Sequence, residues 1–169
     1  SQYAGMGSDL HDEFDVARKV YAEAGEVLGY DIAELSFKDP EDTLNLTRFT
    51  QPALLTHSVA CLEVFKELTG DRLKPAITAG HSLGEYTALV AAKVLSFESA
   101  LKLVQKRGEL MGTHGEGEMT AFPLALNDIQ PIAEKFSCAV AGCNLPEQTV
   151  VGGRSEDLEK VEQEVKETF

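Results

Sequence analysis

Residues 80–84 read GHSLG, which places Ser82 between two glycines at the spacing of a nucleophile elbow. The stretch before it, PAITAG, is short and apolar, and the stretch after it has a helical pattern. A sharp turn from a strand into a helix would hold a central serine in a strained backbone conformation and expose its hydroxyl above the sheet. Ser82 is therefore a candidate nucleophile for attack on a carbonyl carbon, unless the segment is only a tight turn with a solvated hydroxyl.

The neighbours of Ser82 fit the same chemistry. Gly80 and Gly84 lack Cβ atoms, so we expect them to let adjacent segments approach closely. The backbone N–H of Leu83, freed at the start of the helix, could donate to the oxyanion that forms when Ser82 attacks. The turn does not supply the group that takes the serine proton, because His81, directly beside the nucleophile, should point away from it.

A second chemically capable residue, Arg107, completes an otherwise apolar stripe. The stripe belongs to a predicted helix over 97–112 and comprises Ala100, Leu103/Val104 and Leu110/Met111. An unpaired buried guanidinium is costly, so Arg107 must either extend to solvent or meet an anion. In the second case its planar fork would hold a ligand carboxylate through two hydrogen bonds.

The composition argues against several function classes. The chain has 169 residues and a formal net charge of −13, which argues against a nucleic-acid partner, because phosphate binding needs clustered cations. No apolar run approaches the ~20 residues that a membrane helix needs, and no signal-peptide pattern opens the chain. Four histidines have no metal-ligand spacing, and three cysteines without a CxxC pair fit reduced thiols. We expect a cytoplasmic protein without metal or cofactor.

Helices and a strand must position these side chains. In chain order, the predicted elements of the first part are a helix over 13–28, a loop over 38–47, a helix over 51–70, a strand over 75–80, a helix ending near Val94 and a helix over 97–112. Gly29 should close the first helix, and Pro52 should lie in the first turn of the second, which is apolar enough to lie deep. Ser96 should cap the last.

A different pattern follows residues 112–118, which we interpret as a linker. The predicted elements are a strand over 119–126, a helix over 127–136, strands over 138–143 and 148–153, and a helix that Ser155 caps. Pro123 demotes the first strand to an edge or a bulge, and Asn127 with Gln130 resembles a capping box. The order matches five of the six elements of a ferredoxin-like unit. We therefore divide the chain into 1–116 and a ferredoxin-like subdomain over 117–169 that lacks its last strand.

Four longer stretches resemble the malonyl-CoA:acyl carrier protein transacylases, the loading enzymes of bacterial fatty acid synthesis. They are SQYAGMG (1–7), TQPALLTHSVA (50–60), AGHSLGEYTALVAAKVLSFESALKLVQKRGELM (79–111) and NLPEQTVVGG (144–153), and they match family blocks in the same order. The resemblance implies an α/β fold, with an α/β-hydrolase-like acyltransferase core that carries the ferredoxin-like subdomain. Both would be incomplete in this chain, and residues 1–116 would be the N-terminal part of the core.

The resemblance also implies the activity of an acyl-carrier-protein S-malonyltransferase. Ser82 would take malonyl from coenzyme A as an ester and pass it to the phosphopantetheine thiol of an acyl carrier protein. Leu83 would supply one oxyanion N–H, and Arg107 would hold the free carboxylate of malonyl. Three further residues would line the substrate pocket: Gln51, His81 and Asn144. Malonyl-CoA and the carrier protein are the implied partners, with coenzyme A thioester as substrate and not as cofactor.

Two parts of the family's machinery have no match in this chain. The family's second oxyanion donor is the first glutamine of its N-terminal motif, whereas Gln2 matches the second. Its general base is a histidine that follows the subdomain, and His57 stands in a block where the family has none, which indicates a surface or helix-packing position. The last helix also stops without a cap. We therefore expect residues 1–169 to be part of a longer protein and nearly inert alone.

Three other functions fit parts of the same pattern. A serine thioesterase or hydrolase would use the same elbow, but a neutral acyl group would give Arg107 no role. A stand-alone acyltransferase of a polyketide assembly line would share every residue named above. A non-catalytic module that docks carrier proteins would not need the intact elbow, and it could use Lys102 and Lys106, which equally fit a solvated helix face.

Overall fold

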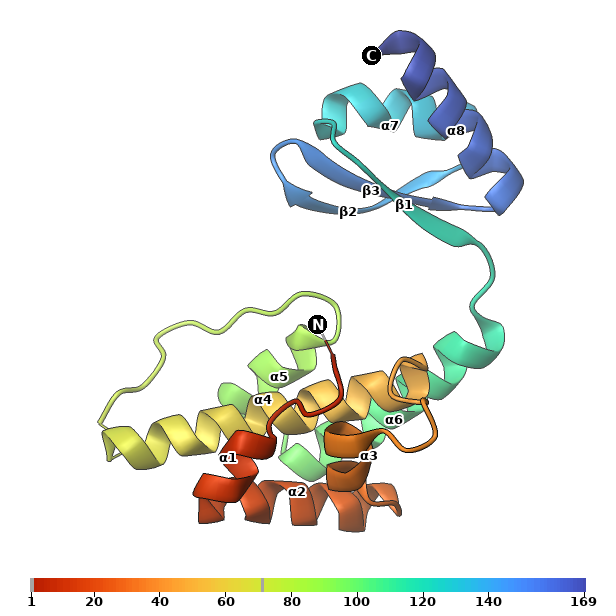
Figure 1. Ribbon diagram of the computed structural model, residues 1–169. Coiled ribbons are helices and arrows are strands. Elements are labelled where there is room, and N and C mark those ends of the chain that lie inside the picture. Colours follow the sequence, from red (N-terminus) through yellow and green to blue (C-terminus); the bar gives the residue numbers. More distant parts are fainter. Residues whose placement is uncertain (1, 71) are drawn as a thin grey trace. The chain divides into compact units, whose positions relative to one another are not determined.

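The computed structural model describes residues 2–70 and 72–169. It divides the chain into two compact units, Ser1–His114 and Gly115–Phe169, so the second unit begins two residues earlier than the boundary expected from the sequence. The described residues of the first unit form helices and loops, and the second unit combines helices with a sheet (Figure 1). The chain therefore has a mixed α and β structure.

The helices of the first unit are α1 (Ser8–Glu13), α2 (Asp15–Leu28), α3 (Ile32–Lys38), α4 (Thr47–Thr69), α5 (Gly84–Ala91) and α6 (Phe97–His114). Three of them enclose its main core. Helices α2, α4 and α6 pack against one another, and their fully buried side chains include Tyr21, Leu55 and Leu101. This core holds α4 beside α6 (Figure 1). These two helices carry Gln51 and Arg107.

Two capping predictions for the first unit are confirmed, one at the end of α2 and one at the start of α6. Helix α2 ends at Gly29, which has a left-handed φ of 80° and donates its N–H to the carbonyl of Gly25 over 2.9 Å. At the start of α6, the hydroxyl of Ser96 accepts a hydrogen bond from the N–H of Ser99 over 3.1 Å. Because α6 is fixed at its N-terminus in this way, the register of Arg107 on the helix is fixed too.

Helix boundaries differ from the sequence expectation in three places. Helix α3 was not expected, although Asp31 caps it by accepting from the N–H of Glu34 over 2.8 Å. Helix α4 begins at Thr47, so Pro52 lies inside the helix, one turn later than expected. Helix α5 ends at Ala91 and not near Val94. The left-handed φ of 60° at Lys93 takes the chain out of the helix there.

The predicted strand over 75–80 is wrong for this structure. Residues 75–80 form no strand, and Ile77 is 87% exposed. A strand needs a neighbouring strand to take its backbone hydrogen bonds, and the described residues of the first unit contain none. The segment is instead tied to α5, because the hydroxyl of Thr78 donates to the carbonyl of Ala88 over 3.0 Å.

The second unit places two helices on a three-stranded antiparallel sheet (Figure 1). Its elements are β1 (Glu118–Phe122), α7 (Leu126–Lys135), β2 (Ala139–Leu145), β3 (Gln148–Gly153) and α8 (Ser155–Thr168). The strand order is β1-β3-β2, so β3 is central and pairs with both neighbours. Both helices pack on the strands, and Ile129, Val151 and Val161 are fully buried between them.

Two capping predictions in the second unit are wrong, whereas the edge strand predicted from Pro123 is confirmed, because β1 lies at one edge of the β1-β3-β2 sheet. The capping box at Asn127 is absent, because α7 starts at Leu126 and Ala125 is the N-cap residue, without a side-chain cap. Ser155 is the first residue of α8 and not its cap, a position taken by Arg154. Strand β1 stops at Phe122, directly before Pro123, which lacks the N–H that another ladder bond would need.

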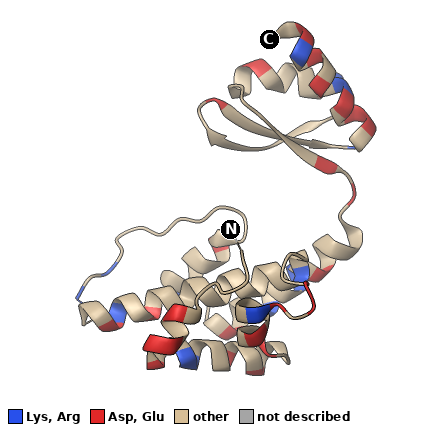
Figure 2. Cartoon of the chain, in the orientation of Figure 1, with Lys and Arg blue, Asp and Glu red and all other residues tan. Residues whose placement is uncertain are grey.

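Charged residues are distributed over the helices and loops of both units (Figure 2). Acidic residues outnumber basic ones, 28 to 15. Seven of the eight ion pairs among the described residues join Lys or Arg to Asp or Glu, and the other joins His11 to Asp12. None of the helices in residues 2–70 and 72–169 has the length and apolar character needed to cross a membrane.

Candidate active site

The turn before α5 holds Ser82 in a left-handed backbone conformation with a φ of 53°. A non-glycine residue pays about 1–2 kcal/mol for this conformation, so the surrounding turn must impose it. The N–H of Gly84 donates to the carbonyl of His81 over 2.9 Å, and the N–H of Glu85 donates to that of Ser82 over 3.2 Å. The turn exposes the serine side chain. A strained, exposed serine at a helix N-terminus provides two of the features of a nucleophile elbow, whereas the strand that precedes the serine in such an elbow is not formed here.

Only one of the two flanking glycines is needed for close approach. A Cβ built on Gly80 would lie 2.0 Å from both the carbonyl carbon and the oxygen of Gly84. A Cβ built on Gly84 would meet no atom within 4 Å. The expectation that both glycines let another segment approach is therefore right for Gly80, which the backbone of Gly84 approaches. It is wrong for Gly84, because no atom lies close to the position of its missing Cβ.

Leu83 combines a buried side chain with an available amide. Its side chain is 9% exposed, and its backbone has helical angles (φ −55°, ψ −35°) as the N-cap residue of α5. Gly84, Glu85 and Tyr86 donate their N–H groups to carbonyls in the turn, but the N–H of Leu83 donates none of the hydrogen bonds found among the described residues. An amide in this position can donate to an oxyanion beside Ser82.

Arg107 of α6 reaches the serine. Its Nη2 donates to Ser82 Oγ over 3.1 Å, and its Nη1 donates to Gln51 Oε1 over 2.6 Å. The guanidinium is half-buried, and among the described residues no carboxylate forms an ion pair with it. Three segments far apart in the sequence thus meet at one cation, which the structure satisfies with two neutral oxygens.

Gln51 of α4 is the buried member of this group, at 4% exposure. Because a guanidinium only donates hydrogen bonds, the amide atom that faces Arg107 must be the oxygen. The amide nitrogen then faces two acceptors, Thr47 Oγ1 at 2.8 Å and Met111 Sδ at 3.4 Å. Thr47 and Met111 did not enter the site predicted from the sequence. Thr47 lies four residues before Gln51, and Met111 lies four residues after Arg107. This i, i+4 spacing along a helix was the only sequence signal that could have found them.

A close helix contact sets the separation of Gln51 and Arg107. A Cβ built on Gly108 would lie 2.7 Å from the Cα of Arg48 and 2.9 Å from the carbonyl oxygen of Thr47. Glycine at this position therefore lets α6 touch the backbone of the first turn of α4. Since Arg107 precedes Gly108 directly, the contact brings its guanidinium within reach of the buried amide.

Three other residues discussed from the sequence, His81, Asn144 and Gln2, make the following contacts. His81 is exposed, and its carbonyl accepts a turn hydrogen bond. Asn144 belongs to β2 of the second unit, where its amide donates to Gln148 Oε1 over 3.4 Å. Gln2 donates from Nε2 to Asn45 Oδ1 over 3.0 Å. The substrate roles of His81 and Asn144 stay predictions.

No histidine of the described residues forms a hydrogen bond with Ser82. His57 lies half-buried on α4, where its Nδ1 has no hydrogen-bond partner and its Nε2 is 3.7 Å from the sulfur of Cys61. Burial lowers the pKa of His57, and the Asp9 carboxylate partly offsets that effect. Burial also raises the pKa of the Cys61 thiol, with Asp9 adding to the rise. The position of His57 fits its interpretation as a helix-packing residue. Because the pKa of Cys61 is raised, the contact between His57 and Cys61 does not produce a thiolate.

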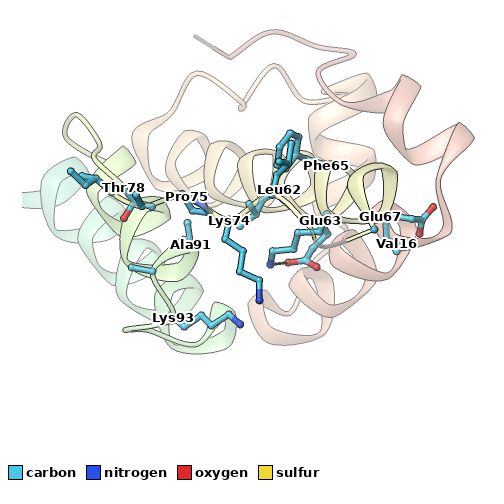
Figure 3. Close-up of a pocket in the computed structure, with 16 residues that line it drawn as sticks. Val16, Leu62, Glu63, Phe65, Glu67, Lys74, Pro75, Thr78, Ala91 and Lys93 are labelled. Atoms are coloured by element: carbon cyan, nitrogen blue, oxygen red, sulfur yellow. Dashed lines mark hydrogen bonds and ion pairs between the residues drawn. The ribbon is translucent and has the colours of Figure 1, made fainter.

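The first unit also has a groove whose lining does not include the serine. This groove of about 770 Å³ runs between the second half of α4, residues 73–78 and the end of α5 (Figure 3). Its walls are largely apolar, and on its rim Lys66 pairs with Glu63 at 2.6 Å. Ser82, Arg107 and Gln51 do not line it. Among the described residues no group of three or more potential metal ligands gathers, in the groove or elsewhere.

Comparison with known protein families identifies the family of this chain. A model of the acyl transferase domain matches residues 1–169. The chain belongs to the acyl transferase domain family. This membership fits an exposed serine in a left-handed turn with a helix N-terminus behind it, the arrangement expected of a residue that accepts an acyl group.

Relatives of this acyl transferase domain include enzymes with named substrates. The chain is 42% identical over 166 residues to the polyketide biosynthesis malonyl CoA-acyl carrier protein transacylase PksC of Bacillus subtilis, covering 95% of the chain and 55% of that protein. It is 39% identical over 176 residues to the malonyl CoA-acyl carrier protein transacylase of the same organism, covering 99% and 55%. The acyl transferase domain thus spans about half the length of these relatives.

A solved structure extends the match to three dimensions. The malonyl CoA-acyl carrier protein transacylase of Clostridium perfringens superposes with a TM-score of 0.92 at 38% sequence identity. The superposition covers 98% of this chain and 54% of that one. The fold of the acyl transferase domain described above is therefore shared with the corresponding half of a malonyltransferase.

Proposed function

We propose that this domain carries the acyl-accepting site of a malonyl-CoA:acyl carrier protein transacylase, with Ser82 as nucleophile and Arg107 as the residue that binds the malonyl carboxylate. One observation carries the proposal. The guanidinium of Arg107 lies 3.1 Å from the oxygen of a serine held at a positive φ. A cation beside a nucleophile selects for a substrate whose negative charge is close to its reactive carbonyl.

Malonyl thioester has that property. One methylene separates its free carboxylate from the thioester carbonyl, so a cation that already touches the nucleophile can also reach the carboxylate. Arg107 has no carboxylate partner among the described residues, so the substrate would supply the missing counter-charge of a half-buried cation. A neutral acyl group would leave the cation without one, which makes a plain thioesterase or hydrolase the weaker proposal.

The proposed reaction has two transfers. Ser82 Oγ attacks the thioester carbonyl, the C–S bond to coenzyme A breaks, and the serine proton ends on the released thiol. The thiol of the carrier protein then attacks the ester, a C–S bond forms, the C–O bond breaks, and the proton returns to the serine oxygen. The N–H of Leu83 would stabilise the oxyanion in both steps. Gln51, His81 and Asn144 remain the proposed further contacts of the substrate.

The finer description of the fold is part of the proposal. The βαββα order and the strand order β1-β3-β2 support a ferredoxin-like subdomain over Gly115–Phe169. Assignment of the first unit to an α/β-hydrolase-like acyltransferase core rests on the family resemblance, because the described residues of this unit form helices and loops. A cytoplasmic location fits a coenzyme A thioester substrate and the three free cysteines of the described residues.

A second candidate function differs only in the pathway. Loading of a carrier protein in fatty acid synthesis is the first proposal, and loading of a polyketide carrier protein is the alternative, which rests on the 42% identity to a polyketide biosynthesis transacylase. The 43% identity to the malonyl CoA-acyl carrier protein transacylase of Staphylococcus aureus means that identity alone does not choose between them. Kinetics with one carrier protein of each kind discriminate between them. A kcat/KM that is about tenfold higher with one of the two carriers, equivalent to about 1.4 kcal/mol in activation free energy, assigns the pathway.

The acylation experiment tests the function itself. We expect the protein at its natural length to form one malonyl ester on Ser82 when mixed with malonyl-CoA, as peptide mass spectrometry would show. Ser82→Ala should form none, and acetyl-CoA should acylate the unmodified protein far more slowly. Equal labelling by malonyl-CoA and acetyl-CoA would contradict the proposal, and so would a malonyl ester at another residue.

A further inference from the structure

We propose that Thr47 is a positioning residue for Arg107: its hydroxyl fixes the Gln51 amide, and the fixed amide oxygen holds the guanidinium at the serine. The inference rests on the proposed function, since it assigns the origin of malonyl preference to a residue that does not touch the substrate. The described contacts form a chain from Thr47 Oγ1 through Gln51 and Arg107 to Ser82, with lengths of 2.8, 2.6 and 3.1 Å.

The orientation of the Gln51 amide decides whether Arg107 is held or repelled. With the oxygen toward Arg107, the amide accepts a hydrogen bond from Nη1. Rotated by half a turn, it would place an NH₂ group against a guanidinium, two donors facing each other in a buried site. Gln51 is 4% exposed, so water cannot readily repair that mismatch.

Thr47 supplies the strong acceptor for the amide nitrogen, while Arg107, which can only donate, keeps the amide oxygen on its own side. Its Oγ1 accepts from Gln51 Nε2 over 2.8 Å. The other acceptor of Nε2 is the thioether sulfur of Met111 at 3.4 Å, a weak one. Without the hydroxyl, the amide nitrogen would keep only the weak sulfur acceptor, and the Gln51 side chain would be held less firmly against Arg107.

The hydroxyl of Thr47 is itself held in place by packing on α6. A Cβ built on Gly112 would lie 3.6 Å from the methyl carbon of Thr47, so the methyl group faces α6. With the methyl group there, Oγ1 lies on the side of Gln51, and a β-branched side chain has little freedom to exchange the two. The carbonyl oxygen of Thr47 would be 2.9 Å from a Cβ built on Gly108, so its backbone is fixed against α6 as well.

The expected functional signature is selective. Malonyl carries a free carboxylate and acetyl does not, so loosening the guanidinium should slow malonyl transfer and leave acetyl transfer almost unchanged. A merely structural role for Thr47 would lower both rates together. The informative quantity is therefore the ratio of kcat/KM for malonyl-CoA to kcat/KM for acetyl-CoA.

The experiment compares three variants of the protein at its natural length. Thr47→Val keeps the shape but removes the hydroxyl, and we expect it to lower the malonyl-to-acetyl ratio by about three- to tenfold, the worth of one hydrogen bond. Thr47→Ser keeps the hydroxyl and should retain the ratio. Thr50→Val is the matched control, because the Thr50 hydroxyl donates only to the carbonyls of Leu44 and Leu46. It should leave the ratio unchanged.

An unchanged ratio in Thr47→Val would overturn the inference, as would an equal loss in Thr47→Ser. A measurement on the unsubstituted protein applies even if Thr47→Val does not fold: the Gln51 side-chain NH₂ should exchange with solvent at least about tenfold more slowly than a free amide. Exchange at the free rate would also overturn it. Arg107→Ala, measured in parallel, separates the two levels. A ratio lowered by Arg107→Ala but not by Thr47→Val refutes only the role of Thr47, whereas a ratio insensitive to both refutes the proposed function.

Discussion

Arg107 donates from Nη2 to Ser82 Oγ over 3.1 Å while its Nη1 donates to the buried Gln51 Oε1 over 2.6 Å. The serine lies on an exposed turn, and the glutamine lies in the core between α4 and α6. One guanidinium therefore connects the most exposed part of the site to its most rigid part. A residue at the surface can be positioned accurately when its hydrogen-bond partner is anchored in this way.

Removing the guanidinium should remove malonyl preference. We expect Arg107→Ala to lower the ratio of kcat/KM for malonyl-CoA over acetyl-CoA by about ten- to hundredfold, the range for hydrogen bonds to a charged group. Arg107→Lys should recover only part of the loss, because an ammonium is a point charge and cannot reach Gln51 and a carboxylate with a planar fork. Steady-state kinetics with both thioesters measure this, and a ratio unchanged in Arg107→Ala would remove the carboxylate-binding role.

The two glycines that flank the serine should respond very differently to alanine. In Gly80→Ala the new methyl group would overlap the Gly84 carbonyl, whose atoms lie 2.0 Å from a built Cβ, so the turn must open. We expect a loss of about 1–3 kcal/mol in the free energy of unfolding and a larger loss of acylation. Gly84→Ala meets no atom within 4 Å and should stay within about 0.5 kcal/mol. Urea unfolding of both variants measures the contrast, and equal losses would contradict the turn geometry.

A second glycine pair tests the contact between α4 and α6. Gly108→Ala would press a methyl group against the backbone of Thr47 and Arg48, at 2.9 and 2.7 Å, and should cost about 1–3 kcal/mol. Gly112→Ala on the same helix meets only the Thr47 methyl at 3.6 Å and should be neutral or stabilising. Gly108→Ala should also reduce malonyl preference, since it separates Arg107 from Gln51. Wild-type stability and selectivity in Gly108→Ala would show that this contact does not set their distance.

His57 should make stability depend on pH. Its pKa in the folded chain is lower than the ordinary 6.5, so near that pH the unfolded chain binds more protons. The free energy of unfolding should therefore be highest above 6.5 and should fall as the pH drops from 6.5 toward the lowered pKa. Urea unfolding between about pH 7 and about pH 5 measures the slope.

Two variants locate that slope at His57. His57→Gln should flatten it, because the side chain no longer titrates. Asp9→Asn should steepen it, since the carboxylate offsets part of the burial effect on the pKa of His57. A slope that survives in His57→Gln would mean that another group causes it.

Much of the site was accessible from the sequence because its chemistry is local. The GHSLG spacing predicted the turn at Ser82, and an arginine on an apolar stripe predicted that Arg107 either extends to solvent or meets an anion. The structure adds the partner, Gln51, which the sequence offered only through a family resemblance. The hydroxyl of Thr47 could not be predicted, since its role depends on which rotamer the packing of α6 selects.

The errors in the fold also have physical causes. Apolar residues 75–80 have strand character, but a strand exists only when a neighbour takes its hydrogen bonds, and periodicity does not report neighbours. Capping residues were misplaced at Asn127 and Ser155, because several polar residues near a helix start can each serve as a cap and backbone geometry chooses among them. The antiparallel pairing of β2 and β3 follows from their two-residue connection, which a sequence can indicate, whereas the pairing of β1 with β3 brings together segments far apart in the chain.

The structure of the malonylated protein tests the central claim most directly. Crystals of the natural-length protein, soaked with malonyl-CoA, should show an ester on Ser82 whose carboxylate accepts two hydrogen bonds from Arg107 at about 2.7–2.9 Å. The Gln51 oxygen should still accept from the same guanidinium. An ester on Ser82 whose carboxylate turns to solvent or to another cation, with Arg107 unmoved, would contradict the account.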